Sequence, residues 1–304
     1  MAVLNEPLHC LRDYPNHFNE DNAKCRRRFG WLMRPSSHPD LLSYVCDGSR
    51  GPGHVILIDP DDQSADEAAK RAVAAVSAGS RMVFVGGSSG TNGNNVHTTV
   101  EAVQEALELC SWNASQDAGM SEDDWKVPVI LFPAGAHALS SAADGITFMM
   151  LMNSRERQFL VGEQVRGAPH IKEAGVTPLS MGYVICAPGG KVGEVGRADL
   201  LQSDDDELAA AYAVCAEAYG FSLLYLEAGS GAATPVPINL IRAAREASEK
   251  MTIIVGGGIR DGKTAHAAVA AGADYIVTGN LTEQFDDAEK LRATLSALIS
   301  EMNS

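Results

Sequence analysis

Short apolar runs recur along this chain from residue 54 onward, and small or polar residues follow each of them. Runs of four to eight apolar residues that are bounded by turn residues are typical of buried parallel strands. We predict eight such strands, and between most of them the apolar spacing changes to that of an amphipathic helix. The predicted strands cover residues 54–59, 81–86, 127–132, 146–152, 182–186, 221–225, 252–255 and 275–277.

The helices between these strands complete the pattern. They are predicted at residues 63–78, 95–109, 156–166, 203–219, 237–250, 261–271 and 287–301. Only about a dozen residues separate the third and fourth strands, and several are Gly or Pro, so we expect an irregular or missing third helix. Strands that alternate with helices in this way predict an α/β fold, the (β/α)8 TIM barrel. In this fold the carboxyl ends of the strands share one face, where the chemistry takes place.

Residues 1–50 lack this periodicity, and we interpret them as an N-terminal extension of a barrel domain that covers residues 51–304. The formal net charge of −15 argues against a nucleic-acid partner, because such surfaces concentrate Lys and Arg. We predict neither a signal peptide nor an integral membrane segment, since the chain shows no basic start before an apolar core and no long apolar run. The six scattered cysteines form no CxxC pair, so we expect a cytoplasmic protein without a disulfide framework.

The strongest candidate site begins in the sixth predicted strand, at residues 225–231. Glu227 stands where this strand ends, and Gly229, Ser230 and Gly231 follow it. Glycines allow the backbone to fold closely around a small anion. A carboxylate beside such a loop is the arrangement of a general base next to an anion site. The alternative is an ordinary glycine turn beside a surface glutamate.

Glycines also follow the seventh and eighth predicted strands. Gly257 and Gly258 come after the seventh, and Gly279 and Asn280 after the eighth. These are the loops at which TIM barrels commonly bind phosphate through backbone amides and a short helix. The pattern therefore predicts a phosphorylated ligand, and glycines that serve only helix–strand packing are the alternative.

A second polar corner is predicted across the mouth of the barrel. Asp59 ends the first strand and Ser88 ends the second. A carboxylate and a hydroxyl that meet at the barrel mouth suit Mg²⁺, which prefers oxygen ligands and completes its shell with water and substrate phosphates. As a bare pattern this is weak, because Asp-Pro-Asp is also a common turn.

These segments, taken in order, resemble geranylgeranylglyceryl phosphate synthase, the prenyltransferase that makes the first ether bond of archaeal-type lipids. The matching segments are residues 58–61, 85–88, 129–133, 151–154, 225–231, 255–260 and 278–280. They span about residues 55–281 and leave the first fifty residues outside. The related bacterial heptaprenyl enzymes carry a lysine just before the first Asp-Pro, where this chain has Leu57 and Ile58. The archaeal-type enzyme is therefore favoured over this relative.

The resemblance implies transfer of the geranylgeranyl group of geranylgeranyl diphosphate to the C3 hydroxyl of sn-glycerol 1-phosphate. It implies that Glu227 is the general base, that Tyr225 helps to hold the acceptor, and that Asp59 and Ser88 hold Mg²⁺ at the diphosphate. We also expect a homo-oligomer, with a dimer favoured. The residues implied for sn-glycerol 1-phosphate are Tyr225, Leu226, Glu227, Ala228, Gly229, Ser230, Gly231, Gly257, Gly258, Gly279 and Asn280.

Two other functions stay open at this point, together with the prenyl chain length. Another phosphate-binding barrel enzyme, such as a sugar-phosphate isomerase or an aldolase-like lyase, would need a lysine or a second acid at a strand end, and we find no such lysine. A barrel that binds its ligand without turnover is disfavoured by Tyr225, Glu227 and Asp59. The prenyl tail needs an apolar groove, which the side chains of residues 148–150 and 152 would line unless they belong to the barrel core.

Overall fold

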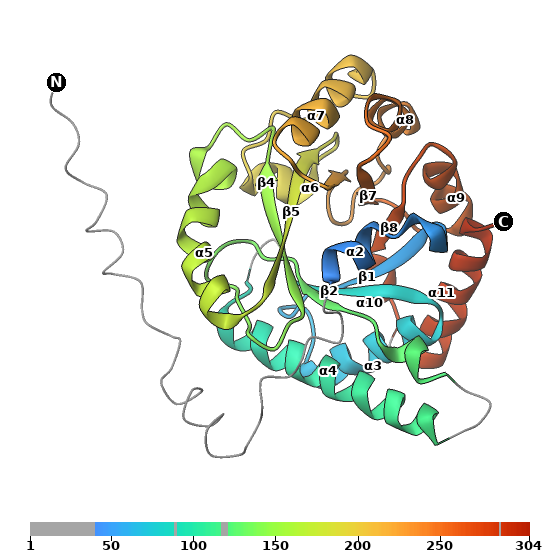
Figure 1. The fold of residues 1–304 in the computed structure, drawn as a ribbon. Helices are drawn as coiled ribbons and strands as arrows, with labels where there is room; N and C mark the ends of the chain where they lie inside the picture. Colours follow the sequence, from blue (N-terminus) through green and yellow to red (C-terminus); the bar gives the residue numbers. More distant parts are fainter. Residues whose placement is uncertain (1–39, 88–89, 117–120, 286) are drawn as a thin grey trace, which may run out of the picture. The chain divides into compact units, whose positions relative to one another are not determined.

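The computed structural model describes residues 40–304, except 88–89, 117–120 and 286. Eight parallel strands pair in chain order, and β1 also pairs with β8, which closes the barrel. The strands are β1 (Gly53–Ile58), β2 (Ser80–Val85), β3 (Val129–Leu131), β4 (Gly145–Leu151), β5 (Thr177–Ile185), β6 (Leu223–Glu227), β7 (Thr252–Gly256) and β8 (Tyr275–Thr278). The predicted TIM barrel is confirmed, as Figure 1 shows.

Helices follow the strands around the outside of the barrel. Residues 132–144, between β3 and β4, contain no helix, so the predicted loss of the third helix is confirmed. Two short helices, α6 and α10, lie on loops that the sequence pattern did not assign to any helix. The helices of the barrel are α3 (Ala65–Ser77), α4 (Gly93–Ser115), α5 (Glu163–Ala174), α6 (Gly190–Val195), α7 (Asp206–Ala218), α8 (Ile238–Ala247), α9 (Gly262–Ala270), α10 (Asn280–Glu283) and α11 (Ala288–Met302), with single turns η3 (Glu122–Trp125) and η4 (Gln158–Gly162).

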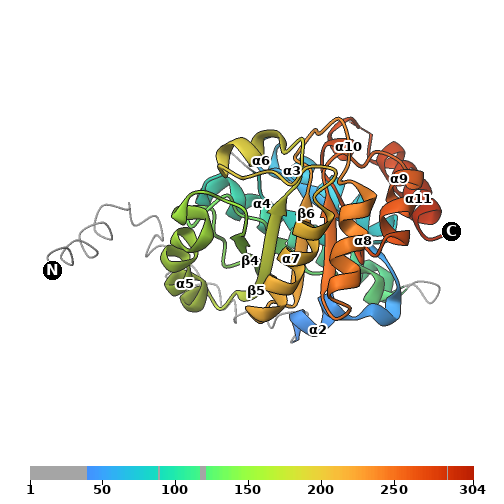
Figure 2. The ribbon, with the colours of Figure 1, turned by 90° about the horizontal axis from the view of Figure 1, so that it is seen from above.

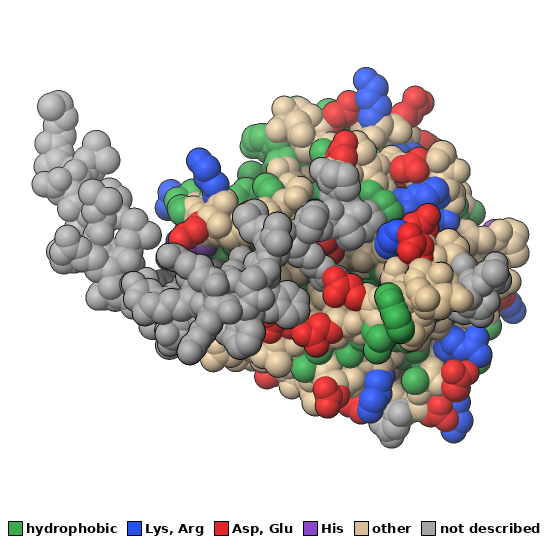
Figure 3. All heavy atoms as spheres, turned by 60° about the horizontal axis from the view of Figure 1, so that its bottom comes forward, with side chains coloured by type: hydrophobic (Ala, Val, Ile, Leu, Met, Phe, Trp, Pro, Cys, Tyr) green, Lys and Arg blue, Asp and Glu red, His purple; other side chains and the backbone are tan. Residues whose placement is uncertain are grey.

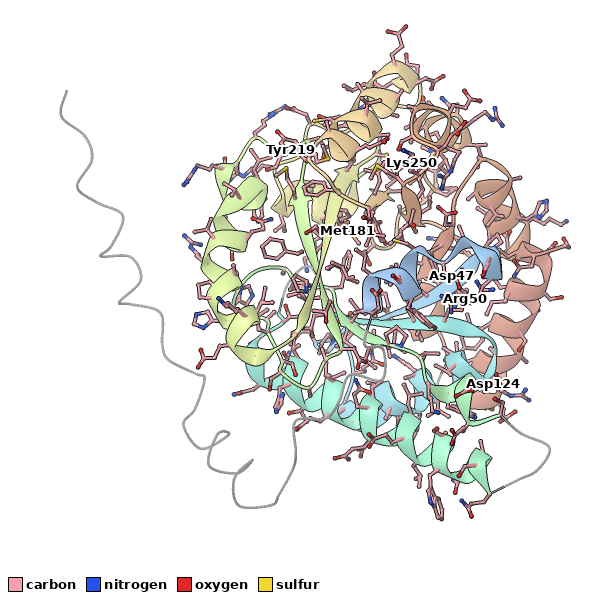
Figure 4. The ribbon with its side chains drawn as sticks, viewed as in Figure 1. Asp47, Arg50, Asp124, Met181, Tyr219 and Lys250 are labelled. Carbon is pink, nitrogen blue, oxygen red and sulfur yellow. The ribbon has the colours of Figure 1, made fainter. Side chains whose placement is uncertain are left out.

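Alternation along the strands separates two apolar cores. On β5, Met181 and Tyr183 belong to the core inside the barrel, whereas Val184 belongs to the core between the barrel and its helices. Figure 4 labels Met181 within the ring of strands. Because both faces of each strand are buried, the strands read as continuous apolar runs, which is why the sequence pattern revealed them.

Residues 40–50, the described part of the predicted extension, lie at the amino-terminal end of the barrel. They form α2 (Leu41–Cys46) and η2 (Gly48–Arg50), and the Asp40 side chain caps α2 by accepting a hydrogen bond from the Ser43 N–H at 3.0 Å. Leu41 and Val45 of α2 are buried in the inner core. Figure 2 shows α2 on the face opposite α6 and α10. Residues 1–39 of the predicted extension lie outside the described residues.

The outer surface carries mixed charges and a few large apolar side chains. On the face seen in Figure 3, acidic and basic side chains are interspersed among polar and apolar ones. Trp112 on α4 and Tyr219 at the end of α7 are each 62% exposed, and Figure 4 labels Tyr219 at the periphery. Within the described ranges, no helix has both the length and the apolar character that crossing a membrane requires.

Candidate active site

A pocket opens at the carboxyl ends of the strands, and side chains or loops from every strand contribute to its lining. This is the face at which TIM barrels carry their active sites. It brings together residues that lie far apart in the sequence. The predicted site residues that line the pocket are Asp59, Tyr225, Glu227, Ser230, Gly231, Gly257, Gly258, Gly279 and Asn280.

Three of the described site residues do not line the pocket. The side chains of Leu226 and Ala228 point away from it, into the core between the barrel and the helices. Gly229 instead orients the Glu227 carboxylate, because its N–H donates a hydrogen bond to Glu227 Oε1 at 2.6 Å. Ser88 lies outside the described residues.

Glu227 is the last residue of β6, and only 6% of it is exposed. Burial raises the pKa of its carboxyl group to about 7, although hydrogen bonds from the Gly229 N–H and the Tyr225 hydroxyl act in the opposite direction. A carboxyl group with a pKa near 7 is ionised in a large fraction of molecules at neutral pH and still accepts a proton readily. The arrangement therefore suits a general base.

The Tyr225 hydroxyl orients the Glu227 carboxylate through a hydrogen bond. Its ring is almost fully buried and lies 5.2 Å from the ring of Tyr183 and 5.5 Å from that of Phe132, measured between centroids. Burial and the nearby Glu227 raise the pKa of the Tyr225 hydroxyl well above its ordinary value, so this hydroxyl stays protonated and can donate. Three aromatic rings therefore fix the position of the donor that orients Glu227.

The lack of a side chain at Gly257 leaves room for the Glu227 carboxylate. A Cβ atom at Gly257 would lie 2.4 Å from Glu227 Oε1 and 2.7 Å from the nitrogen of Gly229, and the φ of +82° favours glycine. The absence of a side chain at this position is therefore required by the carboxylate as well as by any ligand above it.

The loops after β6 and β8 are joined by side chains. The Ser230 hydroxyl donates to Asn280 Oδ1 at 2.8 Å, and Asn280 Nδ2 donates to Glu283 Oε2 at the same distance. Asn280 begins α10 directly after Gly279. Glycine backbone and a hydroxyl thus surround a small space beside Glu227, which fits the predicted anion site.

Asp59 follows β1, the neighbour of β8 in the barrel, so it lies beside the loop after β8 and not across the mouth as predicted. Its environment is acidic. Burial raises the pKa of its carboxyl group to about 6, and the charges of Asp62, Asp61 and Glu283 act in the same direction. None of the described Lys and Arg residues forms an ion pair with Asp59, Asp62 or Glu283. A cation would relieve this repulsion, so the residues fit a divalent metal with few protein ligands and a shell completed by water or phosphate. A cluster of three or more His, Cys, Asp or Glu side chains arranged around one metal position does not occur within the described ranges.

The comparisons with known proteins agree with this geometry. A profile of the PcrB family matches residues 48–298, which is most of the chain. The chain belongs to the PcrB family. The geranylgeranylglyceryl phosphate synthase of Methanococcoides burtonii is 42% identical over 240 residues, which cover 79% of this chain and 90% of that enzyme. The enzyme of the same name from Methanothrix thermoacetophila is 40% identical over 237 residues, which cover 78% of this chain and 86% of that enzyme.

Solved structures of the PcrB family extend the similarity to three dimensions. The crystal structure of (S)-3-O-geranylgeranylglyceryl phosphate synthase from Thermoplasma acidophilum, in complex with its substrate sn-glycerol-1-phosphate, superposes with a TM-score of 0.76 at 32% identity. The match covers 86% of this chain and 98% of that chain. The wild-type enzyme from Thermoplasma volcanium gives the same TM-score at 35% identity, over 86% of this chain and 97% of that chain. The resemblance read from the sequence is confirmed.

In this PcrB-family chain, one part of the pocket lining consists mainly of apolar side chains from β4, β5, η4, α6 and the end of β3, and we call this part the apolar arm. The lining of this arm includes Phe132, Phe148, Met149, Leu151, Phe159, Tyr183, Val192 and Val195. Of the four groove candidates read from the sequence, Phe148 and Met149 line it, whereas Met150 does not and Met152 packs against the core between barrel and helices.

Several other lining residues were not among the predicted site residues. Arg260 and Glu283 also line the pocket, and a signal for both was present, since each lies within four residues of a predicted phosphate-binding glycine. Val192 and Val195 carried no such signal, because only the fold brings α6 over the mouth of the barrel.

Proposed function

We propose that this protein is a geranylgeranylglyceryl phosphate synthase, which joins the geranylgeranyl group of geranylgeranyl diphosphate to the C3 hydroxyl of sn-glycerol 1-phosphate. The observation that carries the proposal is Glu227, a buried carboxyl group with a pKa of about 7 between a glycine-built anion site and an apolar arm. A base, an anion site and an apolar arm are what this reaction requires. The similarity to synthases of this name over most of the chain supports the same conclusion.

For the acceptor, the proposal uses the loops after β6, β7 and β8. The phosphate of sn-glycerol 1-phosphate binds at Ser230, Gly258 and the start of α10, where backbone N–H groups and the helix end favour an anion. Its glycerol part then lies towards Glu227. The Glu227 carboxylate accepts the proton of the C3 hydroxyl as the oxygen attacks C1 of the prenyl group, and the Tyr225 hydroxyl holds the carboxylate in place.

For the donor, the prenyl tail occupies the apolar arm and the diphosphate lies at Asp59. We propose that Asp59, together with Ser88, holds Mg²⁺. When bound, the ion would stabilise negative charge on the departing diphosphate. The Asp59 carboxyl group is ready for this role, since burial and acidic neighbours favour a cation beside it.

The deciding experiment incubates the purified protein with labelled sn-glycerol 1-phosphate, Mg²⁺ and prenyl diphosphates of several lengths. We expect an ether product with the geranylgeranyl donor, and no product when EDTA replaces Mg²⁺. A preference for the heptaprenyl donor would move the assignment to the related heptaprenylglyceryl phosphate synthases. Failure with every prenyl donor would favour another phosphate-binding barrel enzyme.

We further propose a cytoplasmic homodimer. The outer side of α7 supports an interface between copies, because Leu208, Val214 and Tyr219 are 45%, 53% and 62% exposed. Burying such side chains is favourable by roughly 25 cal/mol for each Å² removed from water. Sedimentation equilibrium of the intact chain tests this, and Val214→Glu should shift the mass towards the monomer.

A further inference from the structure

The segment of residues 187–201, between β5 and α7, contributes Val192, Val195 and Gly196 to the pocket wall. Its helix α6 turns Val192 and Val195 towards the apolar arm. Its first turn packs on the acceptor loop, where the Gly189 N–H donates to the Ala228 carbonyl at 2.9 Å. Figure 2 shows α6 on the same face as α10. The contacts that hold the far end of this segment, residues 196–199, therefore determine the position of the arm wall.

Asn153, two residues beyond the end of β4, holds that far end. Only 3% of it is exposed, and its side chain makes three hydrogen bonds to backbone. Nδ2 donates to the carbonyls of Ile185 at 2.9 Å and Asp199 at 2.7 Å, and Oδ1 accepts from the Ile185 N–H at 3.1 Å. A carboxamide carries the donor and acceptor of a peptide group, so it extends the β4–β5 ladder where the β4 backbone turns away.

The two residues after Asn153 strengthen the same connection. The Ser154 hydroxyl donates to the Gly196 carbonyl at 2.6 Å, and the Arg155 N–H donates to the Arg197 carbonyl at 3.0 Å. Residues 153–155 and 196–199 thus lie side by side, joined by backbone and side-chain bonds. Gly196 itself lines the pocket, so the connection reaches the wall of the arm directly.

We propose that Asn153 is a positioning residue for the prenyl donor: its side chain fixes residues 196–199 and thereby the position of Val192 and Val195 along the apolar arm. This inference rests on the proposed function, because it assigns the arm to the prenyl tail. Asn153 lies outside the pocket lining and acts only through α6 and the residues after it. The acceptor loop keeps its own bond from Gly189, so the effect falls mainly on the donor.

The test compares Asn153→Leu with wild type and with Gln104→Leu. Leucine keeps the approximate size of asparagine and removes all three hydrogen bonds. Gln104 is a matched control, since its buried amide also bonds the Ala142 carbonyl at 3.3 Å and Asp144 Oδ2 at 3.0 Å, remote from α6. We expect the KM for geranylgeranyl diphosphate to rise by about 10-fold in Asn153→Leu, the scale of lost buried hydrogen bonds, with the KM for sn-glycerol 1-phosphate within about 2-fold.

A second variant and a second readout protect the test from a folding defect. Ser154→Ala removes one bond to residues 196–199, that to the Gly196 carbonyl, together with local bonds to the Glu156 backbone, and should raise the same KM by about 3-fold. Hydrogen–deuterium exchange of residues 190–199 should accelerate in Asn153→Leu and stay unchanged in Gln104→Leu. If the wild type is active, two outcomes would overturn the positioning role alone. One is an unchanged donor KM in both Asn153→Leu and Ser154→Ala, and the other is an equal rise in KM for both substrates. A wild type without prenyl transfer would overturn the proposed function and the inference with it.

Discussion

The two halves of the pocket are built by different means. The acceptor half, made of the loops after β6, β7 and β8, consists of glycine backbone around a buried carboxylate, and a side chain at position 257 would collide with this carboxylate. The donor half, made of Asp59 and the apolar arm, consists of side chains from several separate elements, and one of these side chains, Val195, is 45% exposed. A small ligand of fixed shape needs the first kind of site, whereas a flexible apolar tail tolerates the second. Substitutions should therefore cost far more in the acceptor half than along the arm.

The largest effect is expected at Glu227. Glu227→Gln keeps the size and one acceptor oxygen but cannot take up the proton of the acceptor hydroxyl, so kcat should fall by about 10²-fold or more. The KM for sn-glycerol 1-phosphate should change less, because glutamine still accepts a hydrogen bond. Steady-state kinetics at saturating prenyl donor measure both constants. A raised KM with an intact kcat would show that Glu227 binds the acceptor and is not the base.

The pH dependence provides the matching test for wild type. Because burial raises the pKa of Glu227 to about 7, kcat/KM should increase as pH rises through 7, and Glu227→Gln should lack this limb. The folding stability should change with pH in the opposite direction. Between about pH 4.5 and 7 the unfolded chain has lost this proton while the folded chain keeps it, so stability falls as pH rises through this window. Above pH 7, Glu227→Gln should therefore unfold at a higher temperature than wild type.

The next effect is expected in the polar part of the donor half. Asp59→Asn removes the charge proposed to hold Mg²⁺, so transfer at limiting Mg²⁺ should fall by about 10²-fold and recover partly at high Mg²⁺. Asp61→Asn is the control, because Asp61 is acidic and close by but does not line the pocket. Undiminished activity of Asp59→Asn at limiting Mg²⁺ would remove this residue from the metal site.

The same contrast explains what the sequence could predict. The acceptor half was predicted in detail because glycine loops at strand ends are local features, and Glu227 follows its strand directly. Of the arm only Phe148 and Met149 were predicted, because Val192 and Phe159 meet them only in the folded chain. Its wall includes α6, where four glycines within and around a six-residue helix give a weak helix signal.

The predicted start of one helix was wrong for a related reason. Ser203 was predicted to begin the helix that carries a run of acidic residues, but α7 begins at Asp206 and its N-cap, Asp205, makes no side-chain capping bond. Leu201 instead pairs with the end of β5, where its N–H donates to the Ile185 carbonyl at 3.1 Å. Tertiary pairing thus overrode a local capping preference.

A pair of glycine variants sharpens the comparison within the acceptor half. Gly257→Ala would place a Cβ 2.4 Å from Glu227 Oε1 at a positive φ, so the carboxylate must move. In Gly279→Ala the Cβ has ordinary contacts, the nearest being the Leu57 carbonyl at 3.6 Å. We expect kcat/KM for sn-glycerol 1-phosphate to fall by about 10-fold or more in the first and by less than about 3-fold in the second. Equal losses, or an equal loss of prenyl donor binding in Gly257→Ala, would point to a folding defect.

The smallest effect is expected in the wall of the arm. Val195→Ala removes two methyl carbons from a half-exposed side chain, and burial of a full methylene is worth about 0.8 kcal/mol, so the KM for geranylgeranyl diphosphate should rise by only about 2–3-fold. Neither kcat nor the acceptor KM should change, because α6 keeps its bond at Gly189 and its connection to Asn153. Val184→Ala, in the core between barrel and helices, is the matched control, since it should lower the melting temperature without changing the donor KM. A loss of 10-fold or more in Val195→Ala would mean that this wall is as finely fitted as the glycine loops, and the contrast between the two halves would fail.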